Sequence, residues 1–452
     1  MKKSKVFTRL TTTIVLLAIL LFGVTSCSKN EDMKGNTGTT GNSIKIYMWD
    51  KDVIMNKLVS QYQQEYPKAI VEMRKFDQIQ EYMQKLSSEI MAGEGPDVLY
   101  FSNYDIGSLY KLFNIGVFAD LDPLIKNDVD FDIGDYNSKI LECGIYKKQR
   151  LFIPFNYKVP AFCTTKEVLQ KNNISFDYNN YNSNDFFTKI EPYISSIQQD
   201  KDRYVFSNWL SLEEYIASSG LKIIDYEKKQ VYFDEPEFIQ LIKNFKKIYR
   251  RCAEADVRQS YLNQDYDMLK SGDTLFINGN YIIHPNDLMF SNSMIKGLLG
   301  QTEVIYPLPK YNGDNSWVAV ADKCLAINNN SNNKQNAFDF IKVALSEKIQ
   351  SDNDIHNIPV NSKVLDKLIY TNKTKQDQEI VYNDKNIVLH AIPDELLTKY
   401  SEIINNVGSC SFIDANIAGL LYQALVPYFE DKTTVEKAID DLKNKAMIYL
   451  NE

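Results

Sequence analysis

From Ile44 onward, short stretches rich in β-branched and aromatic residues alternate with stretches whose apolar residues recur at helical spacing. Helical spacing predicts helices that bury one face, and the short stretches between them predict strands. The expected strands are residues 44–48, 69–73 and 97–101, and the expected helices are residues 51–66, 79–90 and 106–113. Strands that alternate with helices in this way predict a parallel sheet with helices on its faces.

Later segments also predict particular elements. Strands are expected at residues 274–277 and 304–306, and residues 317–327 predict either one long strand or a pair of strands. Near the C-terminus, Thr433 and Glu436 have the spacing of a capping box, which predicts that a helix begins there.

The N-terminus has the order of an export signal. Four basic residues within residues 2–9 precede an apolar run over residues 14–24, which is too short to span a membrane comfortably. The run ends in Val-Thr-Ser-Cys, which resembles a bacterial lipobox, a signal in which the cysteine (here Cys27) is acylated and becomes the mature N-terminus. Residues 1–26 are expected to be a lipoprotein signal peptide and residues 27–43 an acylated cysteine with a flexible tether. The alternative is an ordinary secretory signal in which the cysteine is incidental.

Composition bounds the class of protein. The chain has 452 residues, of which 44% are hydrophobic and 24% charged, enough for two lobes with their own cores. Removal of residues 1–26, which carry four basic and no acidic residues, takes the formal net charge from −8 to −12. Such an acidic body has no electrostatic reason to bind nucleic acid or anionic lipid. Acylation, rather than a basic patch, would hold it at a membrane.

Cysteine and histidine usage argues against metal and redox chemistry. Five cysteines follow Cys27, with no CxxC pair among them, so buried free thiols are the expected state. One long-range disulfide remains open, because an extracytoplasmic compartment would permit it. The sequence contains no HExxH, GxSxG or P-loop pattern, which argues against the commonest hydrolases and NTPases. Neither a metal nor a cofactor is expected.

A series of short motifs runs along the chain. It begins with Gly-Glu-Gly-Pro-Asp-Val at residues 93–98 and Gly-Val-Phe-Ala-Asp-Leu-Asp-Pro at residues 116–123. Further segments follow at residues 153–154, 165–167, 271–279, 306–309, 337–350, 358–360 and 434–439. Their order and spacing resemble the extracellular solute-binding proteins of ABC importers, and in particular the sugar-binding branch of that family. The resemblance covers nearly all of residues 44–452.

The resemblance implies an α/β fold of the type II periplasmic-binding-protein kind, with two lobes joined by crossing strands and a ligand cleft between them. Lobe one is expected at residues 44–155 plus 275–315, and lobe two at residues 159–271 plus 318–452. The implied mechanism is hinge closure around the ligand, which produces the form that a membrane permease recognises. The expected protein is a monomer without enzymatic activity, anchored through Cys27 at the outer face of the bacterial cytoplasmic membrane.

Sugar binding needs aromatic faces against the C–H faces of a pyranose ring, and polar side chains that match its hydroxyls. In a doubly wound sheet, such groups lie beyond the carboxyl ends of strands. The candidates after the first and third strands are Trp49, Asp50, Ser102, Asn103, Tyr104 and Asp105. The alternative roles are a tryptophan that closes the core and aspartates that cap the following helices.

Further ligand contacts are implied by the resemblance at Tyr157, Lys158, Asn208, Trp209, Asn280, Tyr281 and Trp317. Lys158 falls where maltose-binding members carry a glutamate, a departure that argues against maltose itself. Tyr281 aligns with a stacking position that tryptophan usually holds. Packing between or within lobes is the alternative role for Tyr157 and Tyr281, and it is favoured for Trp317.

Three classes of function fit these features. The first is the lipid-anchored component of an ABC importer that binds an oligosaccharide, or else a polyol, a polyamine, a glycerol phosphate ester or a metal complex. The second is a sensor of similar fold that signals to a membrane kinase, which the sequence cannot separate from the first because both would use closure. The third is a surface glycosidase. It needs two carboxylates placed across a sugar, and the resemblance carries no catalysis.

Overall fold

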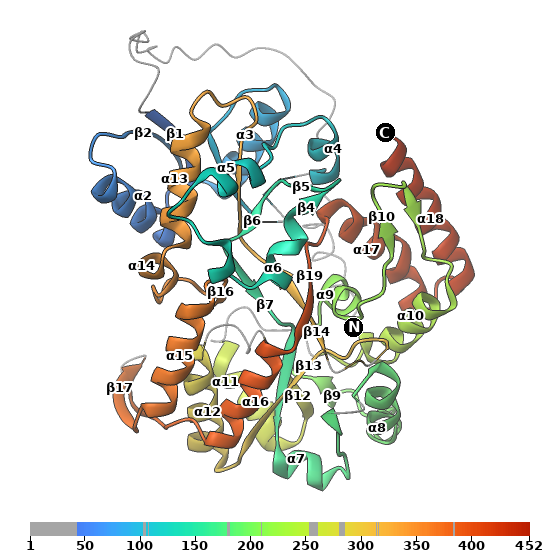
Figure 1. The fold of residues 1–452 in the computed structure, drawn as a ribbon. Coiled ribbons are helices and arrows are strands. Elements are labelled where there is room, and N and C mark those ends of the chain that lie inside the picture. The colour runs from blue at the N-terminus through green and yellow to red at the C-terminus, as the bar shows by residue number, and fades with distance from the viewer. Residues whose placement is uncertain are drawn as a thin grey trace, which may run out of the picture. The chain divides into compact units, whose positions relative to one another are not determined.

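The computed structural model of the protein (Figure 1) describes residues 43–102, 105–106, 108–178, 181–208, 210–252, 261–279, 285–312, 314, 316–382 and 385–452. The predicted signal peptide, Cys27 and the predicted tether up to residue 42 lie outside these ranges.

The first sheet contains five strands in the order β2-β1-β3-β15-β6. β1 pairs parallel to β2 and β3, whereas β15 pairs antiparallel to β3 and β6. The bounds are β1 Ser43–Trp49, β2 Ile70–Phe76, β3 Val98–Phe101, β15 Cys324–Ile327 and β6 Ile153–Pro154. The alternation of strands and helices predicted from residue 44 onward is therefore confirmed, and two antiparallel strands from other parts of the chain complete its sheet.

Helices α2 (Val53–Glu65) and α3 (Ile79–Met91) connect the parallel strands. Asp52 caps α2, because its Oδ1 accepts a hydrogen bond from the amide of Met55 at 3.0 Å. α2 ends before Tyr66, which precedes Pro67 as predicted. Helix α4 (Leu109–Asn114) begins later than expected, since Ile106 lies before its first turn, although the Ile106 side chain is buried.

The second sheet has the strand order β13-β8-β12-β9. Its bounds are β13 Glu303–Pro307, β8 Ala161–Thr165, β12 Thr274–Gly279 and β9 Tyr204–Phe206. β12 and β13 both pair with β8, although the sequence assigned residues 275–315 to the lobe of residues 44–155. Conversely, β15 pairs with β3, although residues 318–452 were assigned to the other lobe. The short motifs carry the order of the elements along the chain, but not the sheet that each strand joins.

A third sheet, here called the crossing sheet, has the order β16-β7-β14-β19. Its bounds are β16 Ile358–Pro359, β7 Asn156–Lys158, β14 Trp317–Ala321 and β19 Val407–Ser411. β7 follows β6 of the first sheet, and β14 is followed by β15 of the first sheet. Residues 317–327 therefore form a pair of strands, rather than one long strand, and the two strands belong to different sheets.

Three short hairpins and the remaining helices complete the fold. The hairpins are β4 Ile145–Tyr146 with β5 Gln149–Arg150, β10 Ile224–Asp225 with β11 Gln230–Val231, and β17 Gln378–Tyr382 with β18 Lys385–Leu389. The remaining helices are η2 Ile133–Asp135, η3 Glu142–Gly144, α5 Asp122–Asn127, α6 Ser138–Leu141, α7 Lys166–Lys171, α8 Ser183–Ser196, α9 Leu212–Ser218, α10 Pro236–Tyr249, α11 Tyr261–Ser271, α12 Pro285–Leu299, α13 Lys334–Leu345, α14 Glu347–Gln350, α15 Ser362–Thr374, α16 Asp394–Asn405, α17 Ala415–Phe429 and α18 Val435–Asn451.

The last helix begins one residue later than its capping-box pattern predicts. Thr434, rather than Thr433, is the capping residue, and its Oγ1 accepts a hydrogen bond from the amide of Lys437. None of the described helices is both long and apolar enough to cross a membrane.

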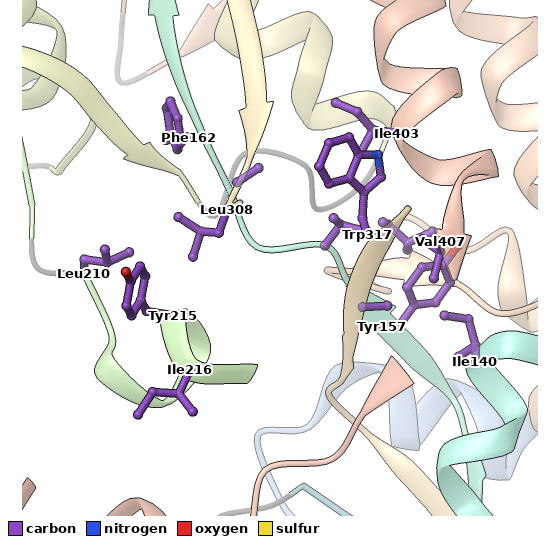
Figure 2. Packing of buried hydrophobic residues seen from close by; sticks show 14 of the residues in the cluster. Ile140, Tyr157, Phe162, Leu210, Tyr215, Ile216, Leu308, Trp317, Ile403 and Val407 are labelled. Atoms are coloured by element: carbon purple, nitrogen blue, oxygen red, sulfur yellow. The ribbon is translucent and has the colours of Figure 1, made fainter. Parts of the chain in front are cut away.

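The large core cluster contains side chains from the second sheet and from the crossing sheet. Phe162 of β8 stacks on Tyr306 of β13, with ring centroids 5.8 Å apart. Figure 2 shows Phe162 in the same cluster as Tyr157, Trp317 and Val407 of the crossing sheet. A smaller cluster packs around Phe101 of the first sheet. The five cysteines among the described residues are all unbonded thiols. Cys163 and Cys324 are buried, as the sequence predicts, whereas Cys143, Cys252 and Cys410 are partly exposed.

One buried carboxyl group should make stability depend on pH. Burial raises the pKa of Glu303 to about 8, although hydrogen bonds with Ser291 and Cys163 oppose that rise. The folded protein therefore keeps a proton that the unfolded chain loses from about pH 4.5 upward, so this stabilising contribution falls progressively as the pH rises to about 8.

We expect Glu303→Gln to remove that pH dependence. The variant should gain stability over the natural protein as the pH rises from about 5 to 8, by at most about 1.4 kcal/mol per pH unit. Urea unfolding at several pH values measures the difference. Glu81→Gln, on an exposed position of α3, is the matched control and should run parallel to the natural protein. Parallel curves for Glu303→Gln would contradict the prediction.

Candidate functional site

Charged side chains gather where the chain crosses between sheets, beside the carboxyl ends of β1 and β3. Asp105 follows β3, and its Oδ2 lies 3.0 Å from Nζ of Lys323, which directly precedes β15. The carboxylate is 7% exposed and also accepts a hydrogen bond from the amide of Ser102 at 2.7 Å. The ammonium group lies 5.5 Å from the ring centroid of Tyr100. This ion pair, with its nearly buried carboxylate, places one cation and one anion at the carboxyl end of β3.

Asp52, at the carboxyl end of β1, belongs to the same charged group. Burial raises the pKa of Asp52, while the Met55 amide and the charge of Lys323 lower it and the charge of Asp105 raises it. His356 also acts on this carboxyl group. Asp52 is thus a partly buried carboxyl group whose pKa depends on the charges of both Asp105 and Lys323. It is available as a hydrogen-bonding group at the site.

Trp49 and Asp50 lie at the end of β1, as the sequence predicts. The indole of Trp49 is partly exposed, and its Nε1 donates to the carbonyl oxygen of Asp77 at 3.3 Å. Asp50 is exposed and lies 3.2 Å from Nζ of Lys75. Neither side chain is enclosed by the core, so the partly exposed indole remains accessible to a ligand.

A second ion pair lies at the end of β7 in the crossing sheet. Lys158, the last residue of β7, pairs with Glu214 of α9, and both side chains are partly buried. The neighbouring Glu213 accepts a hydrogen bond from the hydroxyl of Tyr422 at 2.6 Å. Asn208, which precedes α9 along the chain, is also partly buried. This part of the site thus contains a paired lysine (Lys158), two carboxylates (Glu213 and Glu214) and an amide (Asn208).

Tyr157 and Trp317 are placed differently from the other candidates. Tyr157 is 0% exposed and Trp317 is 5% exposed. Trp317 packs edge-to-face on Tyr181, with ring centroids 6.0 Å apart. Figure 2 shows both residues among the apolar side chains of the core. Packing is the role that this geometry supports.

Five other candidate residues lie outside the described residues: Asn103, Tyr104, Trp209, Asn280 and Tyr281. Of the predicted ligand-binding residues, the structure brings Asp105 and Ser102 into contact. It places Trp49 and Asp50 at the end of the neighbouring strand β1, and Lys158 at the end of β7 in the crossing sheet. The assignment of these residues to ligand binding stays a prediction.

Four charged residues of the site escaped the sequence analysis: Asp52, Glu213, Glu214 and Lys323. The signal for Lys323 was available, because Asp322 and Lys323 interrupt an otherwise apolar run over residues 317–327. The position of Asp52 before α2 predicts an N-cap. That role gives no sign that the same side chain also belongs to the charged group of Asp105 and Lys323. Glu214 lies in an ordinary amphipathic helix, where nothing in the sequence distinguishes it.

Direct contacts also join the segment after β3 to the C-terminal helices and the β10–β11 hairpin. The ring centroids of Tyr110 and Tyr226 lie 5.0 Å apart. Nδ2 of Asn416 donates to Oγ of Ser108 at 3.0 Å. Beside these contacts, α9, β10 and the start of α17 enclose a cavity of about 190 Å³. A hinge motion between these segments would act directly on these contacts.

The described residues contain no group of three His, Cys, Asp or Glu side chains placed to hold a metal ion. The arrangement offers two ion pairs near the crossing connections, together with further carboxyl groups and a partly exposed indole. Such a set can match the hydroxyl groups and the apolar face of a small polar molecule.

Comparison of the sequence with protein-family models gives a match to bacterial extracellular solute-binding proteins over residues 57–380. Among curated proteins, none matches the sequence significantly.

Solved structures with a similar fold are numerous. The sugar-binding protein MalE from Xanthomonas citri is 14% identical, with a TM-score of 0.66 over 91% of this chain and 98% of that one. An ABC substrate-binding protein from Listeria monocytogenes, in complex with cycloalternan, is 14% identical, with a TM-score of 0.62 over 91% and 100%. UgpB from Mycobacterium tuberculosis, in complex with glycerophosphocholine, is 14% identical, with a TM-score of 0.58 over 91% and 99%. The fold is therefore the two-lobe, periplasmic-binding-protein-like α/β fold expected from the sequence.

The ion pair of Lys323 with the nearly buried carboxylate of Asp105 gives a direct test of the charged group. We expect Lys323→Met to lower the free energy of unfolding by about 1–3 kcal/mol, because it leaves the nearly buried carboxylate of Asp105 without its cation. The double variant Lys323→Met with Asp105→Asn should recover much of that loss. Urea unfolding of the two single variants and the double variant measures the coupling.

Lys445→Met is the matched control, because Lys445 pairs with Asp441 on the exposed surface of α18. This variant should change stability little. A loss in Lys323→Met no greater than the control's would contradict the prediction.

Proposed function

Because the chain belongs to the family of bacterial extracellular solute-binding proteins, we propose that it captures a carbohydrate, most favourably an oligosaccharide, for an ABC importer. Family and fold are those of binding proteins rather than enzymes. The observation that carries the proposal is the presence of two ion pairs near the crossing connections: Asp105 with Lys323 at the end of β3, and Lys158 of the crossing sheet with Glu214 of α9.

The two lobes of the proposed mechanism follow the sheets. One lobe is built on the first sheet, and the other on the second sheet with helices α9, α17 and α18. A ligand that touches both lobes favours the closed form only through contacts that the open form lacks. The crossing strands are the segments that would absorb the hinge motion. The closed form would then deliver its ligand to the permease subunits in the membrane.

The ligand class rests on the types of side chain available. The partly exposed indole of Trp49 suits the C–H face of a sugar ring, and the carboxyl groups of Asp50, Asp52 and Glu213 suit its hydroxyls. Two of the similar structures carry the descriptions sugar-binding protein and complex with cycloalternan, which supports a carbohydrate here. The proposed ligand set also keeps the predicted residues outside the described ranges, Tyr281 and Trp209 among them.

A glycerol phosphate ester is the second candidate ligand. One similar structure holds glycerophosphocholine, and Lys158 and Lys323 supply two cations that could face a phosphate. Both cations are already paired with carboxylates, which weakens their attraction for an anion. A carbohydrate therefore remains the first proposal.

We expect a carbohydrate to raise the melting temperature of the soluble protein, residues 28–452. A ligand at about 100 times its dissociation constant should add about 2.7 kcal/mol to the free energy of unfolding. Differential scanning fluorimetry against oligosaccharides, polyols, polyamines and glycerol phosphate esters measures the shift. Trp49→Ala should lose the shift, whereas Tyr370→Ala, which removes an exposed aromatic side chain from α15, should keep it.

The outcomes separate the proposals. A shift with a glycerol phosphate ester alone would replace the carbohydrate by the second candidate. If no compound in the panel gives a shift, the importer proposal loses its support, and a sensor that partners a membrane kinase becomes the better account.

The proposed anchor is an acylated Cys27. We expect the full-length protein, expressed in a bacterium, to partition into the detergent phase of a Triton X-114 extraction, and Cys27→Ala to move it into the aqueous phase, because acyl chains supply the membrane affinity. Cys252→Ala is the matched control and should stay in the detergent phase. Detergent partitioning of Cys27→Ala would contradict the anchor.

A further inference from the structure

Three cysteines from distant parts of the chain meet in the smaller core cluster. Cys143 lies in η3, Cys324 begins β15, and Cys410 lies in β19. All three pack in the cluster built around Phe101 and Phe152. The other two described cysteines, Cys163 and Cys252, lie in or against the large cluster instead. The grouping therefore singles out three of the five thiols.

Cys143 and Cys410 are the neighbouring pair among these three. Cα atoms of η3 and β19 come within 8 Å of one another, and the Cys410 thiol is close enough to act electrostatically on the Cys143 thiol. Both side chains are partly exposed, whereas Cys324 is 0% exposed. A small oxidant could therefore reach the first two thiols more easily than the third.

The surrounding packing holds the two segments together. Phe412, two residues after Cys410, packs on Phe152 with ring centroids 5.3 Å apart. Gly144, next to Cys143, lies so close to Phe152 that a Cβ atom on Gly144 would stand 1.9 Å from the Phe152 carbonyl oxygen. Both segments thus pack against a common neighbour, Phe152, and this packing keeps the two cysteines close to each other.

We infer that Cys143 and Cys410 form a reversible disulfide when the protein meets an oxidant. The compartment permits it, because the family is extracellular and disulfides persist outside the cytoplasm. The oxidant would be a disulfide, RSSR, either a small molecule or an oxidised thiol–disulfide oxidoreductase. One protein thiolate attacks a sulfur of RSSR and releases one RSH, and the second protein thiol attacks the resulting mixed disulfide and releases another. The two thiol protons leave with the two RSH molecules.

The bond would tie the two proposed lobes together, a consequence that rests on the proposed function. η3 packs against β6 of the first sheet. β19 belongs to the crossing sheet and leads into α17, which packs on α9 of the other lobe. A covalent link at this point would limit the rotation of one lobe relative to the other. Oxidation would therefore reduce ligand-induced closure without removing any ligand contact.

The rate of oxidation should depend on pH. The neighbouring Cys410 thiol and burial both raise the pKa of Cys143 well above its ordinary value. Because the thiolate is the attacking species, the reaction should be slow near neutral pH and should accelerate as the pH rises.

The test uses the full-length chain with Cys27→Ser, which leaves five cysteines. The reduced protein is incubated with glutathione disulfide at about pH 8.5, near the ordinary thiol pKa. Thiols are then counted after unfolding, and peptides are mapped by mass spectrometry. We expect the count to fall from five to three, with the peptides of Cys143 and Cys410 linked. Cys143→Ser and Cys410→Ser should each abolish the linkage, whereas Cys252→Ser, the matched control, should keep it.

Two outcomes would overturn the inference: five thiols that persist in the folded protein, or a linkage that joins Cys324 or any other cysteine in place of one member of the pair. Melting curves of the two serine variants show whether they fold, and either variant alone suffices if the other does not. The mapping needs no ligand, so a failure of the proposed carbohydrate function leaves this result readable. If a ligand is found, the same oxidised protein should show a smaller ligand-induced change in radius of gyration than the reduced protein.

Discussion

The two connections between the first sheet and the crossing sheet run antiparallel and are hydrogen-bonded to each other. The amide of Phe155 donates to the carbonyl oxygen of Lys323 at 2.7 Å, and the amide of Lys323 donates to Oδ1 of Asn156 at 2.9 Å. Asn156 is almost completely buried, and a buried amide side chain is stable only when it is paired. Because these bonds fix one connection against the other, they also fix where Asp105, Lys323 and Lys158 lie.

The same arrangement explains how a binding event could move a large part of the molecule. The ion pairs lie next to the connections, whereas the contact of Tyr110 with Tyr226 joins the segment after β3 to the β10–β11 hairpin. A ligand that engages charged groups on both sides adds free energy only to the state in which both sides face it. The contacts of Ser108 with Asn416 and of Tyr110 with Tyr226 then contribute to the free-energy difference between the open and closed forms, which ligand binding shifts. The disulfide inferred between Cys143 and Cys410 would act on that difference, rather than on the ligand itself.

The sequence predicts the first sheet and its helices well, because residues 44–101 carry strong local patterns. Tyr66 before Pro67 ends α2, and Asp52 caps it. The sequence does not predict which sheet a strand joins, since β12, β13 and β15 are apolar in either place and their pairing is decided by distant partners. For the same reason, it identifies Trp49 and Asp105 at strand ends but misses Lys323, Glu214 and the partly buried role of Asp52. Charge pairing between remote segments leaves almost no local signal.

The central claim is that a ligand joins two lobes across the crossing strands. Hydrogen exchange, measured with and without the panel compound that gives the largest thermal shift, tests this claim most directly. The account predicts slower exchange near Asp105 and Lys323 on one side and near Lys158 and α9 on the other, in the same complex. Protection confined to one side, with the other side unchanged, would contradict it.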